Sequence, residues 1–262
     1  MRVIAITNQK GGVGKSTTAT ALATGLMREG YSTLLIDNDP QCNSTDTFRA
    51  VIRDQATLFD VLVKDEPIVE AIQHTEIGDI LAGDPFLNDA EKLLSQQGRE
   101  YRLKEALEGL PKDKYDFVLI DTPPDLGILL TNALTAADAC IIPITPDRYS
   151  LQGLSQLDET IARVRKYSNH ELEIDGLLIV MNEARTKLSK EVREMIPAVC
   201  DKLGTRCFAT SIRRTQAVKE AQKRRQSLFT WAPDSTAAKD YEAFIDEYMR
   251  LQCVKEEAEQ HG

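Results

Sequence analysis

Short apolar runs alternate along the chain with longer stretches in which apolar residues return at helical spacing. The runs are rich in valine, isoleucine and leucine, as buried strands are, and they cover residues 3–7, 32–37, 117–121, 140–144 and 176–181. Strands that alternate with amphipathic helices are typical of βαβ units. The pattern therefore predicts an α/β fold, in which a mostly parallel, twisted sheet is flanked by helices on both faces.

The first predicted helix comes directly after a glycine-rich loop. Its apolar positions fall at i, i+3, i+4 and i+7, which places them on one face of a helix over residues 17–29. These positions are Ala19, Leu22, Ala23 and Leu26. Gly30 is placed to end the helix.

The chain shows no internal repeat and no linker rich in proline, glycine or serine. We therefore expect one domain over residues 1–262. Since the first strand begins at Arg2 or Val3, we expect no N-terminal helix-turn-helix domain. Residues 53–112 are more polar, and we expect them to form helices and connections at one edge of the sheet.

The C-terminal stretch predicts a helix over residues 239–258 that packs on the body of the domain. A helix that lies on a membrane surface carries lysine and arginine on its polar face. Here the polar face is acidic, which favours packing and argues against a membrane anchor. The apolar face holds Tyr241, Phe244, Ile245, Tyr248 and Met249, and the acidic face holds Glu242, Asp246 and Glu247.

Composition narrows the location and the chemistry. The five cysteines are widely spaced without a C-x-x-C pair, and the three histidines stand apart. This usage indicates a reducing cytosol and argues against a zinc site. No apolar run approaches the ~18 residues that cross a bilayer, and no signal segment precedes the first strand. We therefore expect a soluble, cytoplasmic protein.

The charge is distributed unevenly. The chain has a formal net charge of −9, yet six cations surround Glu220 within residues 213–225. Because the rest of the chain is acidic, any contact with DNA must be local. A charge run is also the ordinary solvated face of a protein, so both interpretations stay open. The candidate DNA-binding residues are Arg213, Arg214, Lys219, Lys223, Arg224 and Arg225.

The loop NQKGGVGKST, residues 8–17, has the chemistry of a phosphate site. It departs from the pattern G-x-x-x-x-G-K-[ST], because Gln9 replaces the first glycine, and from the dinucleotide pattern, because Thr17 replaces the third glycine. A glycine run between a strand and a helix directs backbone N–H groups at an anion. The candidate phosphate-binding residues are Gly11, Gly12, Val13, Gly14, Lys15, Ser16 and Thr17.

Within this loop, each side chain predicts a specific contact. Lys15 is placed to reach the β- and γ-phosphates of a nucleotide, and Thr17 to donate to phosphate oxygens. Ser16 stands where a hydroxyl ligates Mg²⁺ in such loops. The sequence therefore predicts a P-loop NTPase that binds Mg²⁺ with its nucleotide.

Two further strands deliver carboxylates at their C-terminal ends, where α/β sheets place ligand chemistry. FVLIDTPPDLG ends its strand at Asp121, which suits Mg²⁺ directly or through water, and its prolines and Gly127 suit a segment that senses the γ-phosphate. LLIDNDPQCN ends its strand at Asp37, a second metal candidate. Asp39 in the following loop either orients the hydrolytic water or caps a helix.

Together, KGGVGKST, DNDPQ and DTPPDLG resemble the ParA/MinD family of deviant Walker-motif P-loop ATPases, and ParA partition ATPases in particular. The resemblance continues through residues 130–157 and 176–188. It implies that Lys10 reaches across an ATP-bound homodimer to the phosphates of the partner subunit, while Lys15 serves its own nucleotide. It also implies that Asp39 positions the water and that Asp121 belongs to the Mg²⁺ site.

ParA-type proteins bind DNA without sequence preference as ATP dimers, and they release it when a ParB-like partner stimulates hydrolysis. The resemblance therefore implies DNA as a partner, and a nucleoid-associated state with ATP. Many relatives carry a proline-arginine-asparagine turn followed by an arginine, where this chain reads Ile212-Arg213-Arg214-Thr215. This departure leaves the DNA-contacting residues open. Asn182 either contacts the adenine or caps its strand.

The leading hypothesis is an ATP-dependent ATPase that segregates plasmid or chromosomal DNA, with a slow basal rate. One alternative is a ParA-like positioner of a protein cargo on the nucleoid. A MinD-like division-site regulator would need a basic C-terminal helix, and this tail ends VKEEAEQHG. A nitrogenase-reductase-like electron donor would need cysteines near DTPPDLG, which has none. A switch with negligible hydrolysis is the non-enzymatic alternative.

Overall fold

In the computed structural model, residues 1–94, 97–147, 153–183 and 187–261 are described. Within them the strands form one eight-stranded sheet. Its pairs are parallel, except that the two strands at one edge pair antiparallel. In spatial order the strands are β3 (Ile72–His74), β4 (Asp79–Leu81), β2 (Thr33–Asp37), β5 (Phe117–Asp121), β1 (Arg2–Ile6), β6 (Ala139–Ile144), β7 (Glu173–Asn182) and β8 (Cys207–Arg213).

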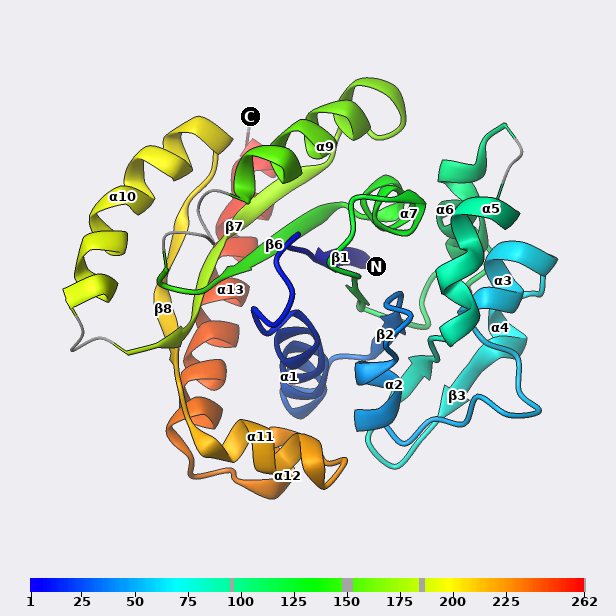
Figure 1. Ribbon diagram of the computed structural model, residues 1–262, viewed down its shortest axis with the longest axis horizontal. Coiled ribbons are helices and arrows are strands. Elements are labelled where there is room, and N and C mark those ends of the chain that lie inside the picture. Colours follow the sequence, from blue (N-terminus) through cyan, green and yellow to red (C-terminus); the bar gives the residue numbers. More distant parts are fainter. Residues whose placement is uncertain (95–96, 148–152, 184–186, 262) are drawn as a thin grey trace.

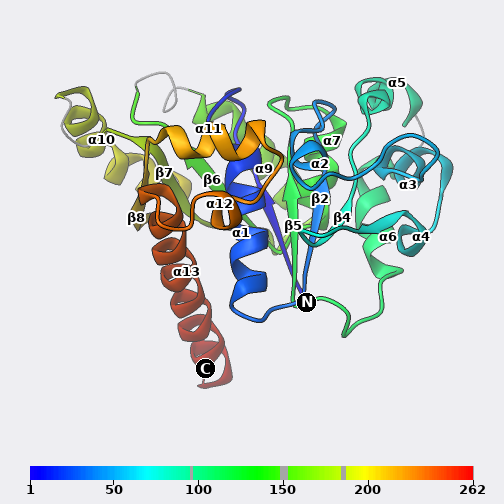
Figure 2. The same ribbon diagram turned by 90° about the horizontal axis from the view of Figure 1, so that it is seen from below.

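Helices cover both faces of this sheet (Figures 1 and 2). One face carries α3 (Leu58–Lys64), α4 (Ile68–Ala71), α5 (Ala90–Leu93), α6 (Arg102–Glu108), α7 (Ile128–Ala136), α9 (Leu154–Tyr167) and α10 (Lys187–Leu203). The other carries α1 (Lys15–Arg28), α11 (Gln216–Lys223), α12 (Leu228–Trp231) and α13 (Thr236–His261). The short helix α2 (Asn43–Thr47) follows β2, and the 3₁₀ turns η1 (Pro85–Asp89) and η2 (Arg99–Tyr101) flank α5.

The predicted α/β class is confirmed, and each of the five predicted strands is present with its bounds shifted by at most a few residues. The expectation for residues 53–112 is incomplete, because this edge also contributes β3 and β4. Each of them has three residues, too few for a pattern to repeat. The strand β8 was also missed, since CFATSIR mixes polar residues with an irregular burial pattern.

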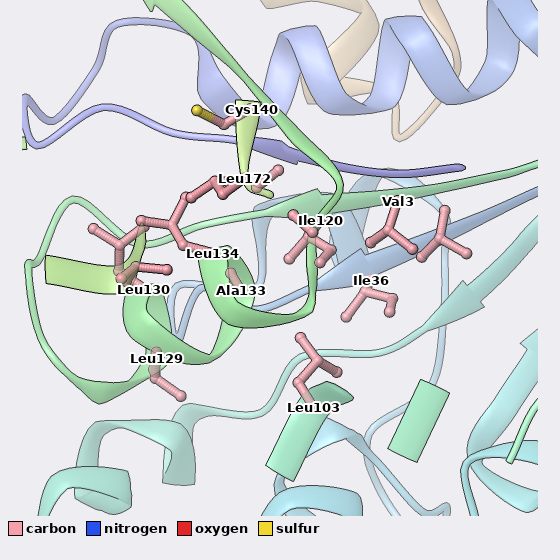
Figure 3. Close-up of a cluster of buried hydrophobic side chains, with 14 of the residues drawn as sticks. Val3, Ile36, Leu103, Ile120, Leu129, Leu130, Ala133, Leu134, Cys140 and Leu172 are labelled. Atoms are coloured by element: carbon pink, nitrogen blue, oxygen red, sulfur yellow. The ribbon is translucent and has the colours of Figure 1, made fainter. Parts of the chain in front are cut away.

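The central strands are buried on both faces, so they read as continuous apolar runs. In β1, Val3 and Ala5 belong to the core on the α7 side, while Ile4 and Ile6 belong to the core on the α1 side. Figure 3 shows the first of these cores, where α7 packs its leucines against the strands. Each such side chain contributes roughly 1.5–3 kcal/mol when fully buried. This packing holds the strand ends in fixed positions.

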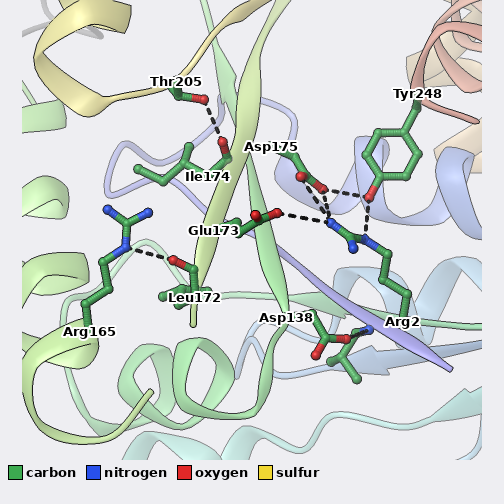
Figure 4. A network of polar contacts seen from close by, with 10 residues as sticks. Arg2, Asp138, Arg165, Leu172, Glu173, Ile174, Asp175, Thr205 and Tyr248 are labelled. Atoms are coloured by element: carbon green, nitrogen blue, oxygen red, sulfur yellow. Dashed lines mark hydrogen bonds and ion pairs between the residues drawn. The ribbon is translucent and has the colours of Figure 1, made fainter. Parts of the chain in front are cut away.

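A polar network ties the N-terminus to α13 at the amino edge of the sheet (Figure 4). Arg2 donates to both Asp175 carboxylate oxygens at 3.1 Å, and the buried Tyr248 hydroxyl donates to Asp175 Oδ2 at 2.7 Å. The backbone N–H of Val3 donates to Asp138 Oδ2 at 2.7 Å. Residues 239–258 lie within α13. This network braces the fold at the edge opposite to the phosphate loop.

Strand register brings the candidate carboxylates together at the carboxyl edge. Asp121 pairs in register with Ile6 on one side and with Asp37 on the other. The loop after β1 therefore begins beside Asp121, and Asp37 lies on the other side of Asp121. Of the segments that resemble the ParA family, residues 148–152 and 184–186 lie outside the described residues.

Candidate functional site

A cavity of about 510 Å³ opens at the carboxyl edge of the sheet. This volume lies within the ~300–1,000 Å³ range of small-molecule sites. One side, which we call the phosphate wall, consists of Gly11, Gly12, Gly14, Lys15, Ser16, Thr17 and Asp39. The opposite side, which we call the α11 wall, consists of Val180, Met181, Ile212, Arg213, Arg214, Thr215, Val218, Lys219, Gln222 and Tyr241.

The phosphate loop has a backbone that only glycine adopts easily. Gly12 and Gly14 have φ of 75° and 79°, and Gly14 is the N-cap of α1. The first N–H groups of a helix have no acceptor within it, so those of α1 are open to an anion. Asn8 braces the loop: its side chain accepts from Lys10 N at 2.9 Å and donates to Pro143 O at 2.7 Å. Val13 is buried beneath the loop and does not line the cavity.

Lys15 is a buried cation on the phosphate wall. Its ammonium donates to Lys10 O at 3.4 Å. Burial lowers the pKa of Lys15, while the Asp121 and Asp39 carboxylates raise it. An anion in the cavity would therefore meet a desolvated positive charge, which interacts more strongly than a solvated one.

Asp121 lies behind the phosphate wall and is fully buried. Its Oδ2 accepts from Ser44 Oγ at 2.8 Å, and the nearby Ser16 hydroxyl lowers the pKa of this carboxyl. Among the described residues its Oδ1 is buried without a partner. Burial, followed by the Asp37 carboxylate, raises the pKa of Asp121. A buried carboxylate with an open oxygen beside a hydroxyl fits a hydrated Mg²⁺.

Asp37 makes different contacts from those expected of a metal ligand. Its Oδ2 accepts from both the N–H and the hydroxyl of Thr45, each at 2.7 Å, and its Oδ1 accepts from Asp39 N at 3.2 Å. It does not line the cavity. Both carboxylate oxygens are thus used to fix the loop after β2 and the start of α2. These contacts give Asp37 a structural role, and its part in a metal site stays a prediction.

Asp39 lies on the cavity and does not cap α2, whose N-cap is Cys42. It lines the cavity and is 5% exposed, and its Oδ1 accepts from Gln41 N at 2.9 Å. Burial raises the pKa of Asp39, while the Gln41 hydrogen bond and the Lys15 charge lower it. The carboxylate therefore faces the cavity from a loop whose conformation it helps to hold.

Lys10 lies outside the cavity. Its ammonium contacts Asp147 Oδ2 at 2.6 Å and Thr145 Oγ1 at 3.4 Å, both after β6. The two lysines of the loop thus point to different places. Lys15 serves the cavity of its own chain, whereas Lys10 is held at the surface.

The basic cluster is divided between the cavity and the surface outside it. Arg213, Arg214 and Lys219 line the cavity, whereas Lys223, Arg224 and Arg225 do not. Among the described residues, three of the six form ion pairs: Arg213 with Asp240 at 2.6 Å, Arg214 with Glu183 at 3.0 Å, and Arg225 with Asp46 at 2.5 Å. The guanidinium of Arg224 stacks 3.9 Å from the centre of the Trp231 ring. All six residues are exposed, and their assignment to DNA stays a prediction.

Comparisons with known proteins agree with this geometry. A family model described as "AAA domain" matches residues 1–174. Over 244 residues the chain is 38% identical to the sporulation initiation inhibitor protein Soj of Bacillus subtilis (strain 168), which covers 92% of this chain and 95% of that protein. Over 226 residues it is 42% identical to the chromosome partitioning protein ParA of Caulobacter vibrioides (strain NA1000 / CB15N), which covers 84% of each. The chain belongs to the ParA-type partition ATPases.

A solved structure similar to this chain contains a bound nucleotide analogue. Cobyrinic acid a,c-diamide synthase from Mycobacterium smegmatis, with a bound ATP analogue and magnesium, superposes with a TM-score of 0.81 at 32% identity over 95% of each chain. The family resemblance drawn from the three motifs is thus confirmed. In the described part of this ParA-type ATPase, no helix is both long and apolar enough to cross a membrane.

The α11 wall of the ParA-type cavity holds residues that the motifs did not indicate. Asn182, for which an adenine contact and a strand cap were both open, does not line the cavity; its side chain donates to Ser211 Oγ at 2.9 Å. Thr215 lines it instead, with a buried hydroxyl that has no partner among the described residues. Ser44, Thr45 and Gln222 also escaped sequence reasoning, because serine, threonine and glutamine are common and their partners are remote along the chain.

Proposed function

We propose that this protein is an ATP-dependent DNA segregation ATPase that moves a plasmid or a chromosome. The observation that carries the proposal is the different placement of the two loop lysines. Lys15 lines the cavity, and Lys10 stands outside it at the surface. In this proposal Lys10 exchanges its contact with Asp147 for the phosphates of a second subunit, which couples dimerisation to ATP.

In this proposal the phosphate wall binds ATP and prepares its hydrolysis. The N–H groups of the loop, Lys15 and Thr17 hold the phosphates, and Asp39 orients the attacking water. Ser16 and Asp121 would hold Mg²⁺, which would neutralise charge on the β- and γ-phosphate oxygens. Within the described residues, no group of three or more histidine, cysteine or carboxylate side chains could hold a metal alone. We therefore expect the nucleotide to complete the metal site.

On the α11 wall, the nucleobase has both apolar and polar neighbours. Val180, Met181 and Ile212 offer apolar surface, and the Thr215 hydroxyl offers a hydrogen bond. These residues replace Asn182 as the proposed adenine contacts. A cavity with mostly apolar lining and a few polar groups is the usual arrangement for such a ligand.

DNA binding is proposed to use the cations that point away from the cavity. Lys223 lies on α11 outside the cavity and, in the described part of the chain, forms no ion pair with a carboxylate. Lysine contacts to phosphate carry no base readout, so binding would be independent of sequence. A ParB-like partner would then raise a slow basal hydrolysis and release the DNA. In the cell the protein would be cytoplasmic and, with ATP, on the nucleoid.

The test is binding to unrelated DNA duplexes without nucleotide, with ADP and with ATP, at two salt concentrations. We expect binding only with ATP, weakened by salt and lost in Lys10→Ala. Lys112→Ala removes an exposed lysine from the loop before β5, at the opposite edge, and should behave as the unmodified protein. If ATP dimers form and ignore DNA at both salt concentrations, the segregation proposal is wrong.

A further inference from the structure

One hydrogen bond connects the two walls of the cavity. Gln222 Nε2 donates to Thr17 Oγ1 at 2.9 Å across a separation of 205 residues. Gln222 lies in the last turn of α11, and Thr17 lies in the first turn of α1. Both residues line the cavity. The helix that carries Lys219 and Lys223 is thus joined directly to the phosphate loop.

The direction of this bond matters for the chemistry. A threonine hydroxyl has a single hydrogen and can accept and donate at the same time. Because it accepts from the Gln222 amide, its own hydrogen must point elsewhere. Among the described residues this hydroxyl donates to no protein acceptor, and the cavity adjoins it. A phosphate oxygen at the N-terminus of α1 is the acceptor that fits.

The position of α11 is sensitive to such a link. Of its eight residues, all of them described, Ala221 is the one that is buried, while Ala217 and Val218 pack partly against the core. A short helix with little buried surface has a low cost of local displacement. The exposed Gln222–Thr17 hydrogen bond at its last turn is therefore one of the contacts that fix it beside the cavity.

We propose that Gln222 is a positioning residue that couples the nucleotide phosphate to α11 through the hydroxyl of Thr17. Gln222 orients this hydroxyl as a donor to the phosphate, and the bound phosphate in return holds α11 in its place. The coupling to DNA rests on the function proposed above, since α11 carries Lys223. Linkage then requires that ATP raise the affinity for DNA by the same factor by which DNA raises the affinity for ATP.

The first experiment measures the dissociation constant for ATP in Gln222→Ala, Gln222→Glu and the control Gln216→Ala. Gln216 is an exposed glutamine of the same helix that does not line the cavity. We expect Gln222→Ala to weaken ATP binding ~2- to 10-fold, the range for one hydrogen bond. Gln222→Glu should weaken it further, because a carboxylate draws the Thr17 hydrogen to itself and repels phosphate. Gln216→Ala should leave it unchanged.

A double-mutant cycle shows whether the effect passes through Thr17. On a Thr17→Val background, Gln222→Ala should cause no further loss of ATP affinity. Additive losses, or equal affinities of Gln222→Ala and Gln216→Ala, would overturn the proposal. Both readouts use ATP alone, so they decide the link between Gln222 and the phosphate even if the unmodified protein ignores DNA.

Movement of α11 has its own reporter. Trp231 is the single tryptophan of the chain, and it stacks on Arg224, the C-cap of α11. ATP should change its fluorescence in the unmodified protein and in Gln216→Ala, and the change should be reduced in Gln222→Ala at saturating ATP. An undiminished change in Gln222→Ala would contradict the coupling, because α11 would then sense ATP by another route.

Discussion

The charged side chains of the two walls of the cavity differ in burial. Lys15 and Asp39 on the phosphate wall are 6% and 5% exposed, and Asp121 behind them is fully buried. On the α11 wall, the side chains of Arg213 and Arg214 are 52% and 59% exposed and form surface ion pairs. Such pairs contribute about 0.2–1 kcal/mol each, whereas buried charges interact strongly. The candidate catalytic residues thus lie on the phosphate wall among buried contacts, whereas the charged residues of the α11 wall make weak surface contacts.

The largest effect should come from Asp121→Asn, behind the phosphate wall. The amide keeps the shape of the carboxylate and the contact with Ser44, but it loses the charge that Mg²⁺ requires. We expect Mg²⁺-dependent ATP hydrolysis to fall by roughly 10- to 100-fold or more. A steady-state phosphate-release assay over a range of Mg²⁺ concentrations measures this.

The control for this change is Asp125→Asn, an exposed carboxylate of the same segment. It should retain hydrolysis close to that of the unmodified protein. If Asp121→Asn were equally active, the metal site would not lie behind the phosphate wall, and the contrast between the walls would lose its chemical basis.

The same substitution should change how stability depends on pH in the absence of Mg²⁺ and nucleotide. Burial raises the pKa of Asp121 and of Asp37, so the folded protein holds these protons at pH values where the unfolded chain has lost them. Stability should therefore fall as pH rises above about 4, the ordinary carboxyl pKa, towards the raised values. Asp121→Asn removes one contribution and should flatten this fall.

Thermal melts of both proteins in a chelator, from pH 5 to pH 8, measure the difference. The flattening should appear as a melting temperature for Asp121→Asn that exceeds that of the unmodified protein most at the highest pH. Parallel melting curves across this range would mean that the buried carboxylate carries no desolvation penalty.

Lys10 belongs to neither wall, and Asp147 holds it outside the cavity. We expect Asp147→Asn to weaken this pair and to raise the fraction of ATP-bound dimer, by ~2- to 5-fold for a contact of about 0.5–1 kcal/mol. Analytical ultracentrifugation with a slowly hydrolysed ATP analogue measures the dimer. Glu159→Gln on α9 is the matched control. Fewer dimers in Asp147→Asn would mean that Asp147 supports Lys10 in the dimer.

The phosphate wall could be predicted from the sequence, whereas most of the α11 wall could not. The phosphate loop and Asp121 could be placed because each follows a buried strand directly, so a local motif and parallel register determine their position. The α11 wall combines β7, β8, α11 and Tyr241, which meet only after folding. The basic cluster therefore looked continuous along the chain, although Arg213 turns to Asp240 and the cavity while Lys223 turns away.

The smallest effects should separate these two cations. Arg213→Ala removes a cavity residue and should weaken ATP binding ~2- to 3-fold, in the range of an exposed pair, with an unchanged salt dependence of DNA binding. Lys223→Ala should leave ATP binding unchanged and lower the slope of log affinity for DNA against log salt by about 1. Titrations of both ligands at three salt concentrations measure this. If Arg213→Ala changed the slope as much as Lys223→Ala, the α11 wall would contact DNA as well as the nucleotide. The two walls would then differ only in the burial of their charged side chains.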